Sequence, residues 1–263
     1  MFLFPTLGLF LGGMQDGELA AAACRAYNCW LFDYCNPYPD RLFGIAMIPM
    51  QSTKDAVAEI EYAVNQLGMR TGFIRPNPYI NRPLHHPDND PVWEAAQHHN
   101  FAIAVHASSS KTMVRLGEDR FTSGSAVIQC TSHALEMEAA VVSFVMCRIC
   151  DRYPKLRVGF MEAGGEWIAG WLDRMYRFFD DQGMNDTGLT LRPSEIFRRQ
   201  CFIAFEPVEK ALPLLADFIG RSNILWASDY PHCDGFTDAP GLLRGLGMAP
   251  ALYQDIMHLG AKR

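Results

Sequence analysis

Basic residues are in the minority in this sequence. There are 23 Lys and Arg against 29 Asp and Glu, which gives a formal net charge of −6 and a pI near 5.7. A nucleic-acid-binding protein needs a concentrated basic face, and no stretch of the sequence supplies one. The charge balance therefore argues against a nucleic-acid partner.

Long apolar runs and a secretion signal are also missing. No apolar run reaches the ~18 to 20 residues that a membrane helix requires. The apolar N-terminus, MFLFPTLGLFLGG, has no basic residues ahead of it and is interrupted by Pro5 and glycines, so we read it as a strand and a loop. The eight cysteines are scattered, and the single C-x-x-C has no second pair at zinc-finger spacing. We expect reduced thiols, a cytoplasmic location and no membrane partner.

What the sequence does contain is an alternation of short apolar runs and longer amphipathic stretches. The apolar runs are residues 43–49, 71–76, 101–106, 156–162, 201–206 and 223–229. Strands that are apolar throughout are typical of a parallel sheet covered on both faces. Repeated strand–helix units in a chain of 263 residues predict an α/β fold, either a (β/α) barrel or a doubly wound sheet.

A charged or titratable residue stands at or just beyond the end of five of these runs. These residues are Arg75, His106, Glu162, Glu206 and Asp229. In a parallel barrel such ends meet at one face, where the active site forms. In a doubly wound sheet, ligand contacts gather at the switch point instead. The pattern favours the barrel, and simple polar capping of the strands is the alternative.

Three of the five residues, His106, Glu162 and Asp229, belong to types that hold a divalent cation. A neutral imidazole and carboxylates suit zinc, manganese or iron. The three residues lie far apart in the sequence, so their spacing alone does not define a metal site.

Five segments resemble the amidohydrolase-related family, which includes aminocarboxymuconate-semialdehyde decarboxylase and related aromatic-acid decarboxylases and hydratases. They are PYPDRLFGIAMIPMQ (37–51), RTGFIRPNP (70–78), RPLHHPDNDPVWEAA (82–96), YPKLRVGFMEAGGEWIAGWLDRM (153–175) and ILWASDYPHCDG (224–235). The resemblance covers nearly the whole chain. It implies one domain over residues 1–263, a (β/α) TIM-type barrel, and one catalytic divalent metal at the C-terminal face, with zinc as the first choice.

The resemblance also assigns individual residues. His106 resembles the metal histidine of the fifth strand, and Asp229 resembles the aspartate of the eighth strand, which binds the metal or its water. Where much of the family has a histidine after the sixth strand, this sequence has Glu162. A glutamate needs a raised pKa to protonate a substrate carbon. We therefore expect Glu162 to act as a base towards water, a third ligand or a partner of a substrate cation, which favours hydrolysis over decarboxylation.

The family carries two further ligands on its first strand, as H-x-H or E-x-H, and neither motif occurs before His106. By resemblance FLFPTLGLF is the second strand, and HLGAKR (258–263) begins the last helix. We expect a barrel without the first βα unit and the end of the last helix. An open sheet edge needs a cover, supplied by the N-terminal stretch, a second chain or a changed strand order. A homodimer or higher homo-oligomer is the expected state.

Other polar residues are candidates for binding a small-molecule substrate. Arg75 suits a substrate carboxylate, with an ion pair that braces the barrel as the alternative, and Asn77 follows it. His133 comes after a long segment, 107–131, which we expect to form a lid. His232 either orients the eighth-strand aspartate and moves a proton or only fixes its loop.

Two functions of different classes follow. The first is a metal-dependent hydrolase or decarboxylase of a small carboxylated or carbonyl compound, with Asp229, Glu162 and His232 as catalytic residues. The second is a truncated, catalytically impaired barrel with a binding or structural role, which the missing first-strand ligands suggest.

Overall fold

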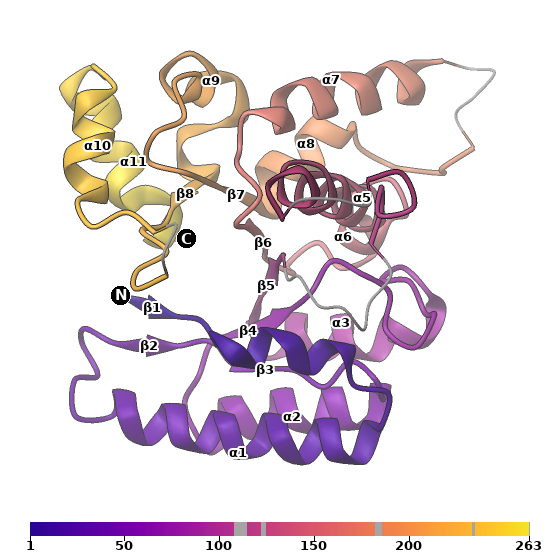
Figure 1. Cartoon of the computed structure of the whole chain (residues 1–263). Helices are drawn as coiled ribbons and strands as arrows, with labels where there is room; N and C mark the ends of the chain where they lie inside the picture. Colours follow the sequence, from indigo (N-terminus) through magenta and orange to yellow (C-terminus); the bar gives the residue numbers. More distant parts are fainter. Residues whose placement is uncertain (108–114, 122–124, 182–185, 233–234, 263) are drawn as a thin grey trace. The chain divides into compact units, whose positions relative to one another are not determined.

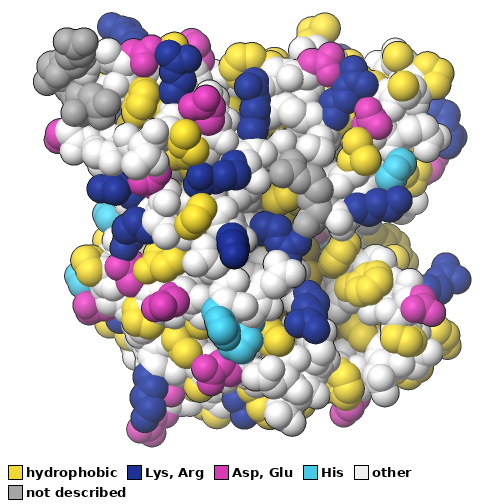
Figure 2. Space-filling view, turned by 180° about the vertical axis from the view of Figure 1, so that it is seen from behind, with side chains coloured by type: hydrophobic (Ala, Val, Ile, Leu, Met, Phe, Trp, Pro, Cys, Tyr) yellow, Lys and Arg dark blue, Asp and Glu magenta, His cyan; other side chains and the backbone are white. Residues whose placement is uncertain are grey.

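The computed structural model describes residues 1–107, 115–121, 125–181, 186–232 and 235–262. The chain packs as two compact units, Met1–Val158 and Gly159–Arg263, and each has its own strands and helices. Among the described residues, no helix is both long enough and apolar enough to cross a bilayer. Acidic and basic side chains are interspersed on the face drawn in Figure 2, which fits the absence of a basic stretch in the sequence.

The first unit is built on parallel strands. β1 (Phe2–Leu3) pairs with β2 (Phe43–Gly44), while β4 (Thr71–Ile74) pairs with both β3 (Ala46–Met47) and β5 (Ala102–His106). The helices of this unit are η1 (Leu7–Gly13), α1 (Gly17–Cys35), α2 (Thr53–Asn65), η2 (Pro87–Asn89), α3 (Asp90–His98), α4 (Ser125–Ile128), η3 (Gln129–His133), α5 (Ala134–Phe144) and α6 (Ile149–Arg152). In Figure 1, α1 and α2 run side by side along one side of these strands.

The second unit repeats the strand–helix alternation. Its strands follow the order β6 (Val158–Met161), β7 (Cys201–Phe205) and β8 (Ile224–Trp226), and β7 and β8 pair in parallel with Phe205 opposite Trp226. Its helices are α7 (Trp167–Asp180), α8 (Pro193–Gln200), α9 (Leu212–Ile219), η4 (Arg221–Asn223), α10 (Ala239–Gly245) and α11 (Pro250–Lys262). Helix α11 packs against β8, with α10 beside it (Figure 1).

Each predicted apolar run contains a β-strand, but the strands are shorter than the runs. All five residues of β7 are buried, as are the last four of β5. Such strands have no solvent-facing side, so polar side chains occur only at their ends. The parallel α/β fold expected from the sequence is therefore observed.

Short polar side chains begin the two long helices of the first unit. The Asp16 carboxylate accepts the backbone N–H of Leu19 at 3.0 Å, and the Ser52 hydroxyl accepts that of Asp55 at 3.3 Å. These bonds satisfy N–H groups that lack a partner within the helix. The N-terminal stretch forms β1 as predicted, but its expected loop is the 3-10 helix η1. The N-terminal stretch is one of the segments expected to cover an open sheet edge, and it does pair with β2.

Asn28 ties α1 to the neighbouring strand. Its fully buried amide accepts the N–H of Met47 at 2.7 Å and donates to the Met47 carbonyl at 3.0 Å, as a paired strand would. The same amide donates to the buried Glu59 carboxylate at 2.7 Å, and Arg25 donates to that carboxylate at 2.8 Å. One side chain thus satisfies both backbone groups at this edge of β3.

Replacing Asn28 by alanine should destabilise the first unit by about 2 to 4 kcal/mol, because two buried backbone groups and a carboxylate lose their partner. Denaturant unfolding followed by circular dichroism measures this change. The exposed Asp33 on the same helix is the matched control, and D33A should stay within about 0.5 kcal/mol of the wild type. An unchanged midpoint for N28A would contradict the assigned role.

Candidate active site

His106 is the last residue of β5 and is 6% exposed. Its Nδ1 lies 2.7 Å from the Ala107 carbonyl oxygen. A carbonyl can only accept, so Nδ1 carries the hydrogen and the lone pair resides on Nε2. The ring packs against Phe4 and Phe73, with centroids 5.0 and 6.0 Å away. This tautomer suits a histidine that binds a metal through Nε2.

In the second unit, two predicted site residues share an unusual backbone conformation. Glu162 follows β6 with φ of 54°, and Asp229 lies just beyond β8 with φ of 49°. They are the only non-glycine residues with positive φ in the described part of this unit. The left-handed conformation costs such residues about 1 to 2 kcal/mol, and backbone strain of this kind clusters at functional sites.

The structure brings Asp229 and His232 together. His232 Nδ1 lies 2.9 Å from Asp229 Oδ1, and the His232 N–H donates to the Asp229 carbonyl at 2.9 Å. The turn is compact, because a Cβ on Gly235 would lie 2.5 Å from the Asp229 carbonyl oxygen. The His232 ring is therefore close enough to orient the Asp229 carboxylate, and the backbone bond between the same two residues also fixes the loop.

Glu209 organises the loops of the second unit, and sequence reasoning missed it. Its carboxylate accepts the backbone N–H groups of Gly165 at 2.9 Å, Glu166 at 2.9 Å and Glu206 at 2.6 Å. Burial raises the pKa of Glu209, while the three N–H donors lower it. The loop that carries Glu162 is thereby tied to the loop after β7, and the strand-end residue Glu206 itself is exposed.

Arg75 and Asn77 follow β4 and are 3% and 2% exposed. Arg75 Nη2 donates to the Pro78 carbonyl at 3.0 Å, and the guanidinium carbon lies 4.5 Å from the centre of the Tyr79 ring. Burial lowers the pKa of Arg75. Within the described residues no carboxylate forms an ion pair with Arg75, so the bracing ion pair considered from the sequence is not found there.

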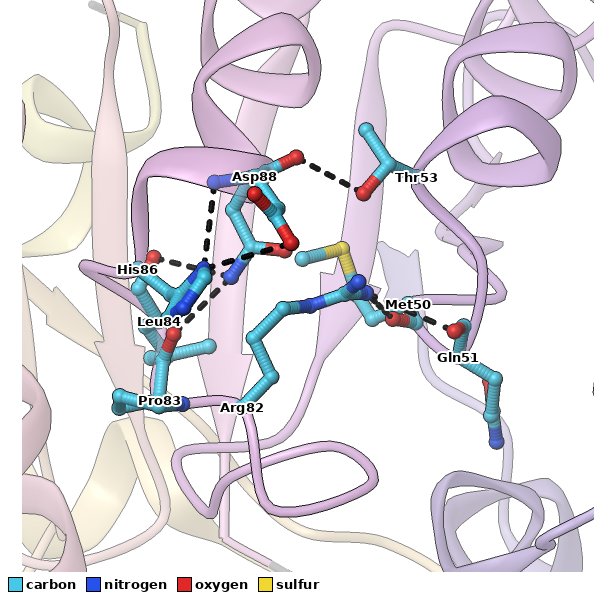
Figure 3. Close-up of polar contacts among 9 residues, drawn as sticks. Met50, Gln51, Thr53, Arg82, Pro83, Leu84, His86 and Asp88 are labelled. Atoms are coloured by element: carbon cyan, nitrogen blue, oxygen red, sulfur yellow. Dashed lines mark hydrogen bonds and ion pairs between the residues drawn. The ribbon is translucent and has the colours of Figure 1, made fainter.

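The segment after Arg75 is anchored to the segment that follows β3 (Figure 3). Arg82 Nη2 donates to the Met50 carbonyl at 2.7 Å, and the Thr53 hydroxyl donates to the Asp88 carbonyl at 2.8 Å. His86 Nδ1 accepts the Asp88 N–H at 3.2 Å and so caps η2. These bonds join two strand-end segments of the first unit and restrict how far the backbone around Arg75 can move.

Glu136 on α5 is a second carboxylate that the sequence did not single out. It is 7% exposed and accepts the backbone N–H of Leu116 at 2.7 Å. Asn77, Arg75 and Arg115 all face it and lower its pKa, but the desolvation of burial outweighs them and raises it. The first unit therefore holds a buried polar group, Arg75, Asn77, Arg115 and Glu136, which we call the Arg75 cluster.

His133 closes a single π-helical turn, Gln129–His133, and is half-buried. π-turns within helices are frequent at functional sites. Residues 108–114 and 122–124 of the expected lid lie outside the described residues. The loop prediction is wrong for 125–131, which is helical because α4 and η3 lead directly into α5.

The described ranges contain no three His, Cys, Asp or Glu side chains grouped closely enough to hold one metal ion. His106 belongs to the first unit, and Glu162 and Asp229 belong to the second. The donor types suit zinc or manganese.

The fold is a parallel α/β fold, and histidine, arginine and carboxylate side chains lie at the ends of its strands. In barrel enzymes the active site forms at such strand ends. This chain belongs to the amidohydrolase family, which matches residues 5–263.

Solved structures agree with that assignment. An amidohydrolase from Mycobacterium avium subsp. paratuberculosis has 23% identity and a TM-score of 0.83, with 99% of this chain and 68% of that chain covered. The 2,6-dihydroxybenzoate decarboxylase from Rhizobium has 19% identity and a TM-score of 0.82, with 100% and 82% covered. A dihydroxybenzoic acid decarboxylase from a Polaromonas species, with bound manganese and the inhibitor 2-nitroresorcinol, has 18% identity and a TM-score of 0.77, with 94% and 76% covered. At such identities these likenesses establish the fold, and the TIM-barrel class predicted from the sequence is confirmed.

Replacing Glu209 by glutamine should loosen the loop that carries Glu162, because an amide NH₂ would face backbone N–H donors. We expect hydrogen exchange of the Gly165, Glu166 and Glu206 amides to quicken by about tenfold, as measured by mass spectrometry. E195Q is the matched control, because the exposed Glu195 accepts only the Arg192 N–H at the start of α8. Equal hydrogen exchange in E209Q and the wild type would show that Glu209 does not hold these two loops together.

Proposed function

We propose that this protein is a metal-dependent enzyme that acts on a small carboxylated or carbonyl compound. The observation that carries the proposal is His106, a buried strand-end histidine whose Nδ1–H is bonded to a carbonyl, so that Nε2 is the ligand nitrogen. The conformation of Asp229 supports it, because a strained aspartate at a strand end is oriented by an imidazole.

His106, Asp229 and Glu162 would hold the metal in this proposal. One imidazole and two carboxylates match the ligands that zinc and manganese take. The manganese bound to the Polaromonas decarboxylase makes a divalent ion plausible for a chain of this fold. When bound, such an ion polarises a substrate oxygen or lowers the pKa of a water molecule.

The remaining chemistry falls to this chain's own side chains. Asp229 takes the proton from water and returns it to the product, and His232 keeps the Asp229 carboxylate aimed while sharing that proton. If Glu162 does not bind the metal, its alternative roles are a base towards water or a partner of a substrate cation. Arg75 and Asn77 bind the substrate, and the half-buried His133 is the further candidate for contact with it.

Two reaction types fit this arrangement. Glu162 in place of a histidine favours hydrolysis, since a carboxylate suits activation of water better than protonation of carbon. The two decarboxylases of the same fold favour decarboxylation. A panel of dihydroxybenzoates and of aryl esters and amides, assayed in ¹⁸O-water, separates them. Hydrolysis places ¹⁸O in the product, whereas decarboxylation releases CO₂ and adds a solvent hydrogen to carbon.

Titration with Mn²⁺ tests the metal site directly, with the electron paramagnetic resonance signal of free Mn²⁺ as the readout. The wild type should bind about one ion per chain, and H106A and D229N should each lose saturable binding. H232N should bind about 10 to 100 times more weakly, because His232 only orients a ligand.

His98 on α3 is the matched control, since it is exposed and H98A should bind Mn²⁺ as the wild type does. Circular dichroism of each variant separates loss of a ligand from loss of folding. Binding that is equal in H106A and the wild type would contradict the proposal. A wild type that binds neither Mn²⁺ nor Zn²⁺ would favour the binding or structural role instead.

A further inference from the structure

The buried Arg75 side chain has N–H groups that donate no hydrogen bond to a described residue. Nη2 donates to the Pro78 carbonyl, whereas Nε and Nη1 are buried and have no hydrogen-bond partner among the described residues. Whichever hydrogen Nη2 uses, one complete pair of parallel N–H groups remains on the guanidinium, and such a pair matches the two oxygens of a carboxylate.

The arm of Arg75 is held in place from two sides. The guanidinium rests over the Tyr79 ring, and the Tyr79 hydroxyl accepts the Arg75 backbone N–H at 2.9 Å. A Cβ on Gly12 of η1 would lie 2.9 Å from Arg75 Cδ, so only glycine leaves room for the arm. Little conformational entropy remains to be lost when Arg75 binds a ligand.

Asn77 adds a second buried polar group, and its only interaction among the described residues is a loose contact with Glu136. Neither its amide nitrogen nor its amide oxygen makes a hydrogen bond of ordinary geometry with a described residue, although Asn77 faces Glu136. A buried amide and a buried guanidinium left unsatisfied each destabilise the folded state by about 1 to 3 kcal/mol or more. Two such groups, two residues apart, point to a ligand that completes them.

The positive and negative charges of the Arg75 cluster balance only when no anionic ligand is bound to it. Arg115 pairs with Glu118 at 3.1 Å, which leaves the positive charge of Arg75 opposite the negative charge of Glu136. A bound carboxylate would give this buried group an excess negative charge. Protonation of Glu136 removes that excess, and Glu136 can still accept the Leu116 N–H when it is protonated.

We propose that Arg75 and Asn77 form a binding site for one carboxylate group of a small ligand, and that Glu136 is the positioning residue that takes up a proton when this site fills. The role of the site in substrate binding rests on the proposed function, but the binding itself does not require the metal. A second negative charge on the ligand would remain uncompensated after Glu136 takes up its proton, so the site selects a monocarboxylate over the phosphate dianion.

The groups that act on Glu136 are Arg75 and Asn77 from the end of β4, and Arg115 and the Leu116 N–H from the segment before α4. None of these titrates near neutral pH. Burial has already raised the pKa of Glu136, and a carboxylate at Arg75 raises it further. Affinity for a carboxylate therefore increases as the pH is lowered, down to the pH at which benzoate and formate themselves take up protons.

Isothermal titration calorimetry of EDTA-treated protein with formate and benzoate tests this proposal. At one pH, titrations in buffers of different ionisation enthalpy give the number of protons taken up. The wild type should take up protons as the carboxylate binds. E136Q should bind benzoate without proton uptake and with an affinity that does not change with pH. R75M should lose at least about tenfold in affinity.

Glu138 on the same helix supplies the control, because E138Q makes the same change two residues away and should keep the proton uptake of the wild type. Proton uptake by E136Q equal to that of the wild type, or equal benzoate binding by R75M, would overturn the proposal. It would also be overturned if neither formate nor benzoate bound to the wild type, or if phosphate bound more tightly than both. Because the metal is absent, these outcomes are independent of the Mn²⁺ titration.

Discussion

The burial of parallel strands on both faces is the constraint on which the rest of this structure depends. β5 and β7 are buried almost throughout, so a polar side chain within them would have neither water nor a backbone partner. Polar residues are thereby confined to the strand ends, where the backbone leaves the sheet. His106 ends β5, Arg75 follows β4, and Glu162 follows β6. The predicted site residues of these strands therefore lie at the strand ends.

A second theme is that charged groups away from water are each held by specific partners. Glu59 is held by Asn28 and Arg25, and Glu209 by three backbone N–H groups. Arg75 differs from them, because among the described residues its buried guanidinium has a carbonyl and an aromatic ring as partners but no carboxylate within ion-pair distance. This contrast is the basis for proposing that Arg75 binds a ligand, whereas Glu59 and Glu209 stabilise the fold.

The strand ends could be predicted from the sequence because five of the six apolar runs stop abruptly at a charged or titratable residue. Roles could be predicted for His106 and Asp229 because the chain as a whole resembles a family whose fifth and eighth strands carry these residue types. Glu136 and Glu209 could not be found in this way. Glu136 lies in the apolar helix sequence ALEMEAAVVSF, where its burial depends on partners from distant segments. The role of Glu209 depends on a loop more than forty residues away.

Other differences have local physical causes. The N-terminal stretch reads as a strand and loop, but its glycines allow η1 to pack closely against Arg75 and Met47. The polar residues before His133 predict a loop, but residues 125–133 are helical because α4 and η3 run directly into α5. Phe4 lies against the His106 ring, a contact that hydrophobic patterning does not predict because Phe4 and His106 are far apart in the sequence.

The proposal that most needs a test is that His106 Nε2 and the Asp229 carboxylate bind a divalent metal ion. A crystal structure of the protein grown with MnCl₂, with anomalous data collected near the manganese absorption edge, tests it most directly. The account predicts an anomalous peak within coordination distance of both groups, about 2.0 to 2.3 Å. A structure in which the only anomalous peaks lie away from His106 and Asp229 would contradict it.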